Sequence, residues 1–412
     1  MKNQGLEETI SNNHNTEYVN LKKPESRLLE SEGRYFISHS PSASIVPVDK
    51  KLASFIVGLP NVYDGILIQQ LQQLLNYGVL TMGMKQQKIE TVHCVSPPIK
   101  TLIFHVNQEC NLRCIHCYIE ADPSKNYQLD GQLISHTITD FAEMGGLVID
   151  ITGGEPLLRK DIFNIFYNAK NSGLHTNLLS NGTNITKNTA SKIKDTTNRI
   201  TISLDGLKEA HDSVRGRDTF DQVSRSLDNL SEENVSIGAT TMLTYMNLNE
   251  LGSVQDFLLT KGVKYWNLVL PRRSGRFKNE YLPDKTCEEW FSNLNKYYAI
   301  LREVKEKAKE SNMEVVIDHV MIPYNDRKGA RIDNSLNHLL YNKGRVCWDN
   351  TITILPNGDV KGCLFIDNFV YGNLNNAGLK TIYTSKNRKE TIERFKQFKG
   401  EKECPIIPIC NH

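Results

Sequence analysis

The sequence of 412 residues has no hydrophobic run long enough for a membrane span and no marked excess of charge of either sign. It contains 49 Lys and Arg against 47 Asp and Glu, with 39% hydrophobic and 23% charged residues, and its mean hydropathy is −0.41. This composition excludes disorder throughout, a collagen-like chain and membrane-spanning segments. A net charge of +2 gives no overall attraction to nucleic acid or to anionic lipid.

Residues 1–30 also lack the apolar block of a secretory signal peptide, which predicts a cytoplasmic protein. The nine cysteines are an odd number. In a cytoplasmic chain they indicate metal ligands or buried thiols rather than a disulfide framework. At about 150 residues per domain, the length predicts two or three domains.

The amino-terminal part divides into two regions. Residues 1–25 are polar and without periodicity, and they predict a disordered tail. Residues 26–95 contain short strand-like segments and a helix, which together predict a small α+β unit of winged-helix type. One face of that helix carries Leu67, Leu71, Leu74 and Leu75. Residues 52–84 contain no Lys or Arg, so the phosphate contacts of a DNA-binding helix are missing.

From Lys100 onward, strand-like and helical segments alternate. Strands are expected at 101–106, 147–152, 174–180, 199–205, 235–242 and 263–271, with helices near 130–144, 159–171, 186–194, 219–233, 248–261 and 286–311. The alternation predicts an α/β fold, a partial (β/α)6 barrel of TIM type over residues 96–312. Residues 313–412 then form a linker and a small domain that holds the last cysteines.

Three cysteines occur in the loop directly after the first expected barrel strand. They are Cys110, Cys114 and Cys117, in the segment CNLRCIHC. Zinc sites and ordinary ferredoxin clusters close with four protein ligands, whereas this loop supplies three. A three-ligand loop leaves one metal position open for a substrate or cofactor, which indicates chemistry at the metal.

Together with GGEP at 153–156, which ends the second expected strand, the cysteine loop resembles the radical S-adenosylmethionine (SAM) superfamily. The resemblance implies that the three thiolates hold three irons of a [4Fe-4S] cluster and that SAM chelates the fourth. It also implies abstraction of an unactivated hydrogen by a 5'-deoxyadenosyl radical. Side chains cannot perform this chemistry, so the protein would position the reactants and exclude solvent.

The resemblance further implies a set of cofactor-binding residues. These are His116, Tyr118, Gly153, Gly154, Glu155, Pro156, Asn181, Ser203, Asp205 and Arg215. Glu155 would lie beside the methionyl ammonium, and Arg215 would pair with the carboxylate of the cofactor. His116 and Tyr118 would lie near the adenine. Each segment alone also fits a turn, a strand end or a solvated charge, and only their common place at strand ends favours the binding role.

Four later cysteines resemble the ligands of the auxiliary-cluster domain called SPASM, or of its shorter relative, the twitch domain. They are Cys347, Cys363, Cys404 and Cys410. The SPASM pattern has seven cysteines, so the set here is shorter, and Glu401 stands where a cysteine often precedes. The resemblance implies one auxiliary iron–sulfur cluster, and the alternative is a set of buried or free thiols. Cys94 and Cys287 belong to neither set and are expected to be simple thiols.

The amino-terminal unit resembles the RiPP recognition element, a domain fused to many enzymes that modify ribosomally made peptides. That resemblance implies a leader peptide bound by strand addition to a sheet edge, which needs backbone pairing and apolar pockets rather than net charge. The alternative is a structural appendage that packs on the barrel.

The three-part order resembles that of sactipeptide synthases, and SGR at 274–276 resembles a segment of the thioether-forming members. It implies a maturase that joins a cysteine sulfur to an α-carbon of a precursor peptide, with flavodoxin or ferredoxin as reductant. One alternative is another peptide modification, namely a carbon–carbon or β-carbon crosslink, epimerisation or formylglycine formation. The other is a non-catalytic iron–sulfur or peptide-binding partner of a second enzyme.

Overall fold

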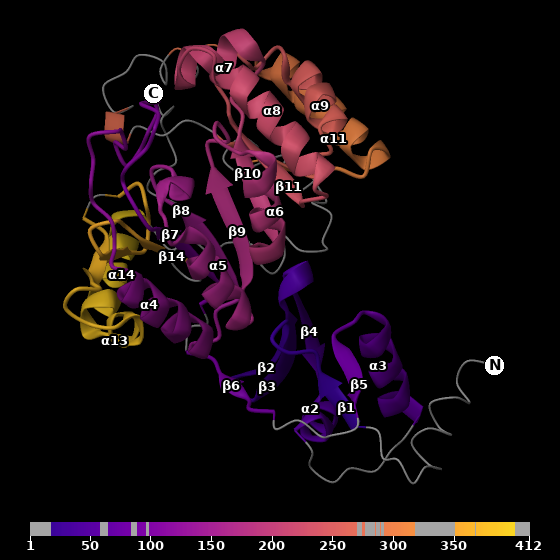
Figure 1. Cartoon of the computed structure of the whole chain (residues 1–412). Helices are drawn as coiled ribbons and strands as arrows, with labels where there is room; N and C mark the ends of the chain where they lie inside the picture. Colours follow the sequence, from indigo (N-terminus) through magenta and orange to yellow (C-terminus); the bar gives the residue numbers. More distant parts are fainter. Residues whose placement is uncertain are drawn as a thin grey trace.

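The computed structural model describes residues 18–57, 65–83, 89–95, 99–269, 274–276, 285, 289, 292–317, 351–366 and 368–399. Figure 1 shows three parts: an amino-terminal unit, a central barrel-like sheet with helices on its outer face, and a carboxy-terminal segment beside the first barrel strand. Within the described part of the chain, no helix has the length and apolar character needed to cross a membrane.

The amino-terminal unit consists of a two-stranded ribbon, a four-stranded sheet and two helices. In the ribbon, β1 (Tyr18–Leu21) pairs antiparallel with β5 (Leu80–Gly83). The sheet has the order β4-β3-β2-β6, and its strands are β2 (Ser26–Ser31), β3 (Arg34–His39), β4 (Ser44–Val48) and β6 (Val92–His93). The helices are α2 (Lys50–Ile56) and α3 (Gly65–Asn76), with the short 3-10 turn η1 (Ser40–Ser42) before β4.

The tail predicted for residues 1–25 is wrong from Tyr18 onward, because β1 is part of the unit and Leu21 is fully buried in its core. The predicted apolar face of α3 is confirmed at Leu71 and Leu74, which pack in the same core. The side chain of Leu67 lies outside the described residues. Helix α2 begins at a capping residue, since Asp49 accepts a hydrogen bond of 2.7 Å from the amide of Leu52.

The barrel strands β7 to β13 are parallel and lie in sequence order. They are β7 (Thr101–His105), β8 (Val148–Thr152), β9 (His175–Ser180), β10 (Arg199–Ser203), β11 (Ile237–Met242), β12 (Tyr265–Val269) and β13 (Glu314–Ile317). The helices are α4 (Gly131–Glu143), α5 (Ile162–Asn171), α6 (Lys187–Thr196), α7 (Lys208–Arg215), α8 (Thr219–Glu232), α9 (Leu251–Thr260) and α11 (Leu294–Glu310). The predicted partial barrel is confirmed, with β13 and α7 in addition to the expected elements.

Strand alternation divides each barrel strand between the core and the barrel interior. In β8, Ile149 and Ile151 are fully buried in the main core with the covering helices, whereas Thr152 lines a cavity in the interior. This follows from the period of two in a strand. Polar side chains in the interior bond to one another, as where Asn177 donates to Asp150 at 2.9 Å.

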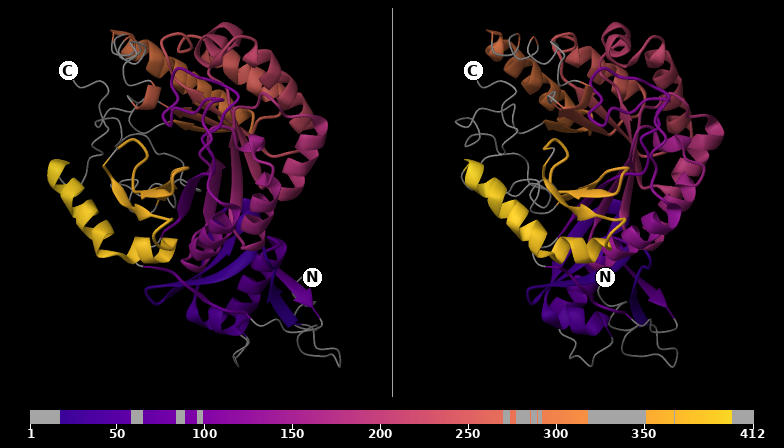
Figure 2. Two further views of the ribbon diagram at one scale, coloured as in Figure 1. Left: turned by 60° about the vertical axis from the view of Figure 1, so that its left-hand side comes forward. Right: turned by 90° about the vertical axis from the view of Figure 1, so that its left-hand side faces the viewer.

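The carboxy-terminal segment extends the barrel sheet instead of forming a sheet of its own. Strand β14 (Thr351–Ile354) pairs parallel with β7, and β15 (Asp359–Lys361) and β16 (Val370–Asn373) follow antiparallel. The predicted hairpin turn at 356–358 is confirmed, with Gly358 at φ +90°. Helices α13 (Leu379–Thr384) and α14 (Lys386–Lys399) complete the segment, which Figure 2 shows in yellow beside the barrel.

The amino-terminal unit docks at the amino ends of the barrel strands. The guanidinium of Arg27 donates to the carbonyls of Ala142, at 3.0 Å in the last turn of α4, and of Gly146, at 2.5 Å just after this helix. At the start of β9, Nδ1 of His175 lies 2.5 Å from the carbonyl oxygen of Ser40. Figure 1 shows the unit below this end of the strands, so it lies opposite to their carboxyl ends.

We predict that Arg27→Ala lowers the free energy of unfolding by about 1–3 kcal/mol, because two carbonyls at the interface lose their donors. The Arg27 guanidinium is shielded from solvent at this interface, and its burial lowers the pKa of Arg27 to about 10. Urea unfolding measures the effect. The matched control is Arg34→Ala, whose side chain is 76% exposed; equal stability of the two variants would contradict the prediction.

Candidate functional site

A cavity of about 340 Å³ opens at the carboxyl ends of the barrel strands. Its walls contain the three loop cysteines and eight of the ten residues expected to bind the cofactor, namely His116, Tyr118, Gly153, Gly154, Asn181, Ser203, Asp205 and Arg215. These residues come from the loops after successive parallel strands, which is where the barrel was expected to carry its active groups. Glu155 and Pro156 are buried beside the cavity and do not line it.

The cysteine loop has two buried sulfurs, those of Cys110 and Cys114, and two sulfurs that accept hydrogen bonds from backbone amides, those of Cys110 and Cys117. Cys110 is 7% exposed and Cys114 is 8% exposed. The amide of Leu112 donates to Sγ of Cys110 at 3.4 Å, and that of Ala121 donates to Sγ of Cys117 at 3.3 Å. Burial raises the pKa of the Cys110 thiol to about 12 and also raises that of Cys114. A bound metal would offset the burial that disfavours the thiolates of Cys110 and Cys114.

The placement of the sulfurs fits a cluster better than a single ion. Within the described ranges, no group of three His, Cys, Asp or Glu side chains is placed to hold one metal ion. In an iron–sulfur cluster each thiolate binds a different iron, so the three sulfurs need not converge on one point. Buried thiols with amide donors, beside a cavity that can admit a ligand, fit a cluster with one open iron.

The GGEP segment lies directly against the start of the cysteine loop. The amide of Gly154 donates to the carbonyl of Asn107 at 2.9 Å, and the amide of Glu155 to that of Glu109 at 2.8 Å. A Cβ on Gly153 would lie 2.6 Å from the Asn107 oxygen, and one on Gly154 would lie 2.6 Å from the Gln108 oxygen. Both positions therefore need glycine, because the two backbones approach too closely for a side chain.

Glu155 organises the neighbouring loop. Its Oε1 accepts from the amide of Leu157 at 3.1 Å and from Oγ of Ser180 at 3.0 Å, while Oε2 accepts from the amide of Asn181 at 2.8 Å. Burial raises the pKa of Glu155. Pro156 begins the 3-10 helix η2 (Pro156–Leu158) behind it. The contact of Glu155 with a methionyl ammonium stays a prediction.

Asn181 connects the loop after β9 with the cysteine loop. Its Nδ2 donates to Oδ1 of Asn111 at 2.8 Å and lies 3.8 Å from Sγ of Cys110. Its Oδ1 accepts from the amide and hydroxyl of Thr183 at 2.9 and 2.8 Å. The side chain is thus fixed on both sides beside the sulfur of Cys110.

An ion pair also lines the cavity. Nε of Arg215 donates to Oδ2 of Asp205 at 2.6 Å, and the amide of Met242 donates to Oδ1 at 2.8 Å. Burial alone raises the pKa of Asp205, but Arg215, together with the nearby histidines and the Met242 amide, outweighs burial, so the pKa is lowered and the pair is ionised. His116 lies 3.3 Å from Nη2 of Arg215, and burial lowers its pKa to about 4. Asp205 therefore orients Arg215.

The carboxy-terminal segment reaches the same cavity through Phe365. The Tyr118 ring stacks edge-on against His105, at 5.6 Å between centroids, and against Phe365, at 5.8 Å. Phe365 lines the cavity and follows Cys363, which is 7% exposed. The predicted auxiliary ligands Cys347, Cys404 and Cys410 lie outside the described residues.

Sequence reasoning missed three residues that shape the site. Asn107 donates from Nδ2 to the carbonyl of Glu155 at 3.0 Å, Phe365 stacks on Tyr118, and Arg276 bonds the cysteine loop. Of these three residues, only Arg276 lies in a segment that the sequence analysis singled out, SGR at 274–276. The contacts of the other two join distant parts of the chain, so neither spacing nor periodicity indicates them.

We predict that acidification destabilises the protein through His105. This fully buried side chain has no hydrogen-bond partner for either ring nitrogen among the described residues, and burial lowers its pKa to about 3. Below the unfolded pKa of about 6.5 the unfolded state binds more protons, so stability falls by up to about 1.4 kcal/mol per pH unit. Urea unfolding between pH 7 and 5 should show a shallower fall for His105→Leu; an unchanged slope would contradict this.

Two family models match the chain. Residues 105–258 match the Radical SAM superfamily, and residues 347–412 match the iron–sulfur cluster-binding domain SPASM. The chain is 25% identical over 387 residues to Fe-coproporphyrin III synthase of Methanosarcina barkeri, covering 86% of this chain and 92% of that protein. It is 24% identical over 316 residues to the antilisterial bacteriocin subtilosin biosynthesis protein AlbA of Bacillus subtilis, covering 74% and 65%.

Among solved structures, Streptococcus suis SuiB bound to precursor peptide SuiA has a TM-score of 0.65 at 14% identity, covering 91% of this chain and 90% of that one. This likeness concerns the fold. The buried thiols, the open cavity and the two family matches agree on the chemistry. Through residues 105–258 the chain belongs to the radical SAM superfamily, as an enzyme whose cofactors are a [4Fe-4S] cluster, SAM and, in its SPASM domain, an auxiliary iron–sulfur cluster.

Proposed function

We propose that this enzyme modifies a ribosomally made precursor peptide by closing a thioether between a cysteine sulfur and an α-carbon. The observation that carries the peptide substrate in this proposal is an open sheet edge in the amino-terminal unit. β6 covers one edge by pairing with β2, Leu29 opposite Val92. Within the described part, β4 lies at the other end of the sheet and pairs only with β3. An exposed edge of this kind accepts an extended peptide as an added strand.

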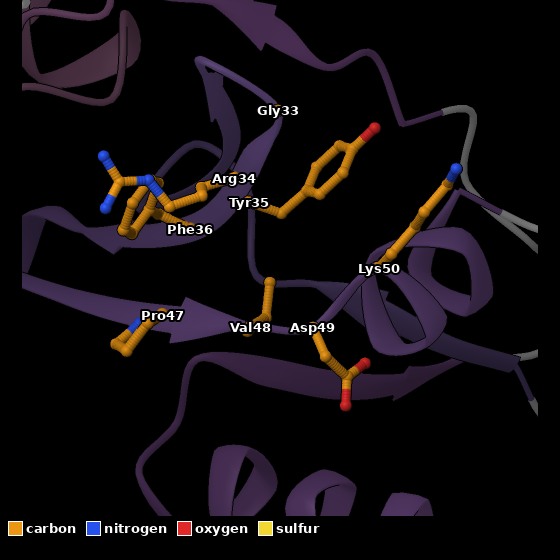
Figure 3. Close-up of a pocket in the computed structure, with 8 residues that line it drawn as sticks. All are labelled: Gly33, Arg34, Tyr35, Phe36, Pro47, Val48, Asp49 and Lys50. Atoms are coloured by element: carbon orange, nitrogen blue, oxygen red, sulfur yellow. The ribbon is translucent and has the colours of Figure 1, made fainter.

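A pocket of about 350 Å³ adjoins the end of this edge. Figure 3 shows the side chains of Arg34, Phe36, Pro47 and Lys50 around it. Backbone pairing gives affinity, and a pocket beside the strand gives specificity. Phe36 and Pro47 suit an apolar side chain of a leader, while Arg34 and Lys50 favour an acidic neighbour. Pro47 has no backbone N–H, and proline is common in edge strands because it limits non-specific pairing with the edges of other chains.

The comparisons support a peptide substrate in two ways. AlbA is named for bacteriocin biosynthesis, and the structure of SuiB contains a precursor peptide. Both similarities extend beyond the radical SAM domain, with AlbA aligned over 74% and SuiB over 91% of this chain. They favour a substrate that engages the amino-terminal unit as well as the barrel.

The residues present fit the chemistry proposed. When bound, the cluster and SAM supply hydrogen abstraction from an unactivated carbon, which no side chain can do. Cys110, Cys114 and Cys117 would hold the cluster. Arg215, oriented by Asp205, would receive the carboxylate of the cofactor. The remaining proposed contacts with the cofactor are those of His116, Tyr118, Gly153, Gly154, Glu155, Pro156, Asn181 and Ser203. Cys363, with Cys347, Cys404 and Cys410, would hold the auxiliary cluster.

A second candidate is tetrapyrrole chemistry, favoured by the similarity to Fe-coproporphyrin III synthase over 86% of the chain. A substrate with several carboxylates needs cations in its site. Among the described cavity residues, the only Lys or Arg side chains are Arg215 and Arg276. Arg215 would already receive the carboxylate of the cofactor, and Arg276 donates to loop carbonyls. This arrangement favours the peptide over the tetrapyrrole.

We predict that the intact enzyme modifies a full-length precursor peptide at least about tenfold faster than the leaderless peptide, because leader binding raises the local concentration of the core. Mass spectrometry should find the loss of two hydrogen atoms per thioether and a cysteine protected from alkylation. A peptide with a scrambled leader is the control. Equal rates for all three peptides would contradict the leader role, and formation of Fe-coproporphyrin III from a tetrapyrrole precursor instead would favour the second candidate.

We also predict that replacing Cys110, Cys114 and Cys117 by alanine abolishes formation of 5'-deoxyadenosine, since the cluster loses all its protein ligands. Iron and sulfide should remain in this triple variant, bound by the auxiliary site. Cys94→Ala, which changes a thiol outside both sets, is the control. Unchanged 5'-deoxyadenosine formation would refute the assignment of the loop, and an iron-free triple variant would refute the auxiliary site.

A further inference from the structure

A short segment after β12, residues 274–276, lies across the cysteine loop. The amide of Arg276 donates to the carbonyl of Cys117 at 3.2 Å. Gly275 has φ +53°, and a Cβ there would lie 2.6 Å from the carbonyl oxygen of Tyr118. The backbones of the segment and the loop therefore touch at a place where no side chain fits. We call residues 274–276 the strap.

The side chain of Arg276 makes two further bonds to the same loop. Its Nε donates to the carbonyl of Cys114 at 3.0 Å, and its Nη2 donates to that of Ala121 at 2.7 Å. These carbonyls lie on either side of Cys117 in the sequence. A planar guanidinium with fixed donors suits two acceptors at once, whereas a lysine ammonium provides a point charge on a flexible stem.

The loop depends on neighbouring segments for its shape. Gln108 donates to the carbonyl of Ile119 at 2.7 Å and Asn111 donates to the hydroxyl of Thr183 at 2.8 Å, while the strap bonds the part of the loop around Cys117. Between Cys110 and Ala121 it contains neither helix nor strand. Its internal bonds are long, as between the amide of Cys117 and the carbonyl of Cys114 at 3.3 Å, and between the amide of Glu120 and the carbonyl of Cys117 at 3.3 Å. Arg276 of the strap donates to both of these carbonyls as well, from Nε to that of Cys114 and from its backbone amide to that of Cys117. A loop with weak internal bonding depends on outside partners for its conformation.

We propose that Arg276 is a positioning residue that holds the cysteine loop in the conformation in which its sulfurs bind the cluster. It acts through the carbonyls of the loop, and its positive charge offsets the negative charge of the nearby thiolates. Ser274 in the same strap lines the cavity, so one segment joins the cavity wall to the cluster loop. The proposal concerns the radical SAM cluster alone and holds for either substrate class.

The test compares Arg276→Ala and Arg276→Lys with the parent chain after anaerobic reconstitution. Iron release to a chelator is followed by the decay of the reduced-cluster EPR signal that shifts on addition of SAM, which separates this cluster from the auxiliary one. We expect Arg276→Ala to lose the signal at least about tenfold faster, since two hydrogen bonds from a charged group are removed. Arg276→Lys should fall between, and Arg217→Ala, whose side chain is 94% exposed, should match the parent.

Hydrogen exchange of the metal-free chains gives a second readout. In Arg276→Ala, exchange should be faster over residues 110–121 and unchanged over β8 and β9. Loss of the EPR signal at the parental rate in both Arg276 variants would overturn the proposal, as would equally fast loss in Arg217→Ala. If Arg276→Ala does not fold, Arg276→Lys decides: faster loss than the parent supports the proposal, and the parental rate overturns it.

Discussion

The candidate site depends on one close approach between two backbones, that of Gly153 and Gly154 to the residues just before Cys110. Hydrogen bonds of 2.8 and 2.9 Å join the two segments, and a Cβ at either glycine would collide with carbonyl oxygens. The loop that carries the cysteines is thereby fixed to the end of β8, and Glu155, the next residue, bonds the loop after β9. Three strand ends are held together by a contact that only glycine permits, and the cavity forms between them.

The two arginines that line the cavity, Arg215 and Arg276, bind protein groups even without a ligand. Asp205 and Arg215 form a buried ion pair that also receives the amide of Met242. Burying charges without partners is costly, so such pairs hold their geometry firmly. Arg276 likewise donates to carbonyls of the cysteine loop. The site thus orients its cations through protein groups, which limits the reorganisation needed when an anionic group binds.

Local patterns predicted the barrel and the cysteine loop, because strand and helix periods and the segments CNLRCIHC and GGEP are contained in short stretches of sequence. Elements with little local signal were missed. β13 has four residues, and α7 is a polar helix of eight residues in which Ala210, His211 and Val214 are buried. The prediction treated the carboxy-terminal part as a separate domain, whereas pairing of β14 with β7 joins it to the barrel sheet. This pairing joins residues that are far apart in the chain, so the local periodicity of hydrophobic residues does not indicate it.

The amino-terminal unit and the cavity lie at opposite ends of the barrel strands, and this separation bears on the substrate. Arg27 and His175 fix the unit at the amino ends, whereas the cavity opens at the carboxyl ends. β9 has six residues, which span roughly 20 Å at the rise of an extended strand. A leader paired with β4 therefore needs a spacer at least this long before its core reaches the cavity. A compact tetrapyrrole bound at β4 could not bridge that distance, so a docked amino-terminal unit is useful to a peptide substrate in a way that it is not to a small one.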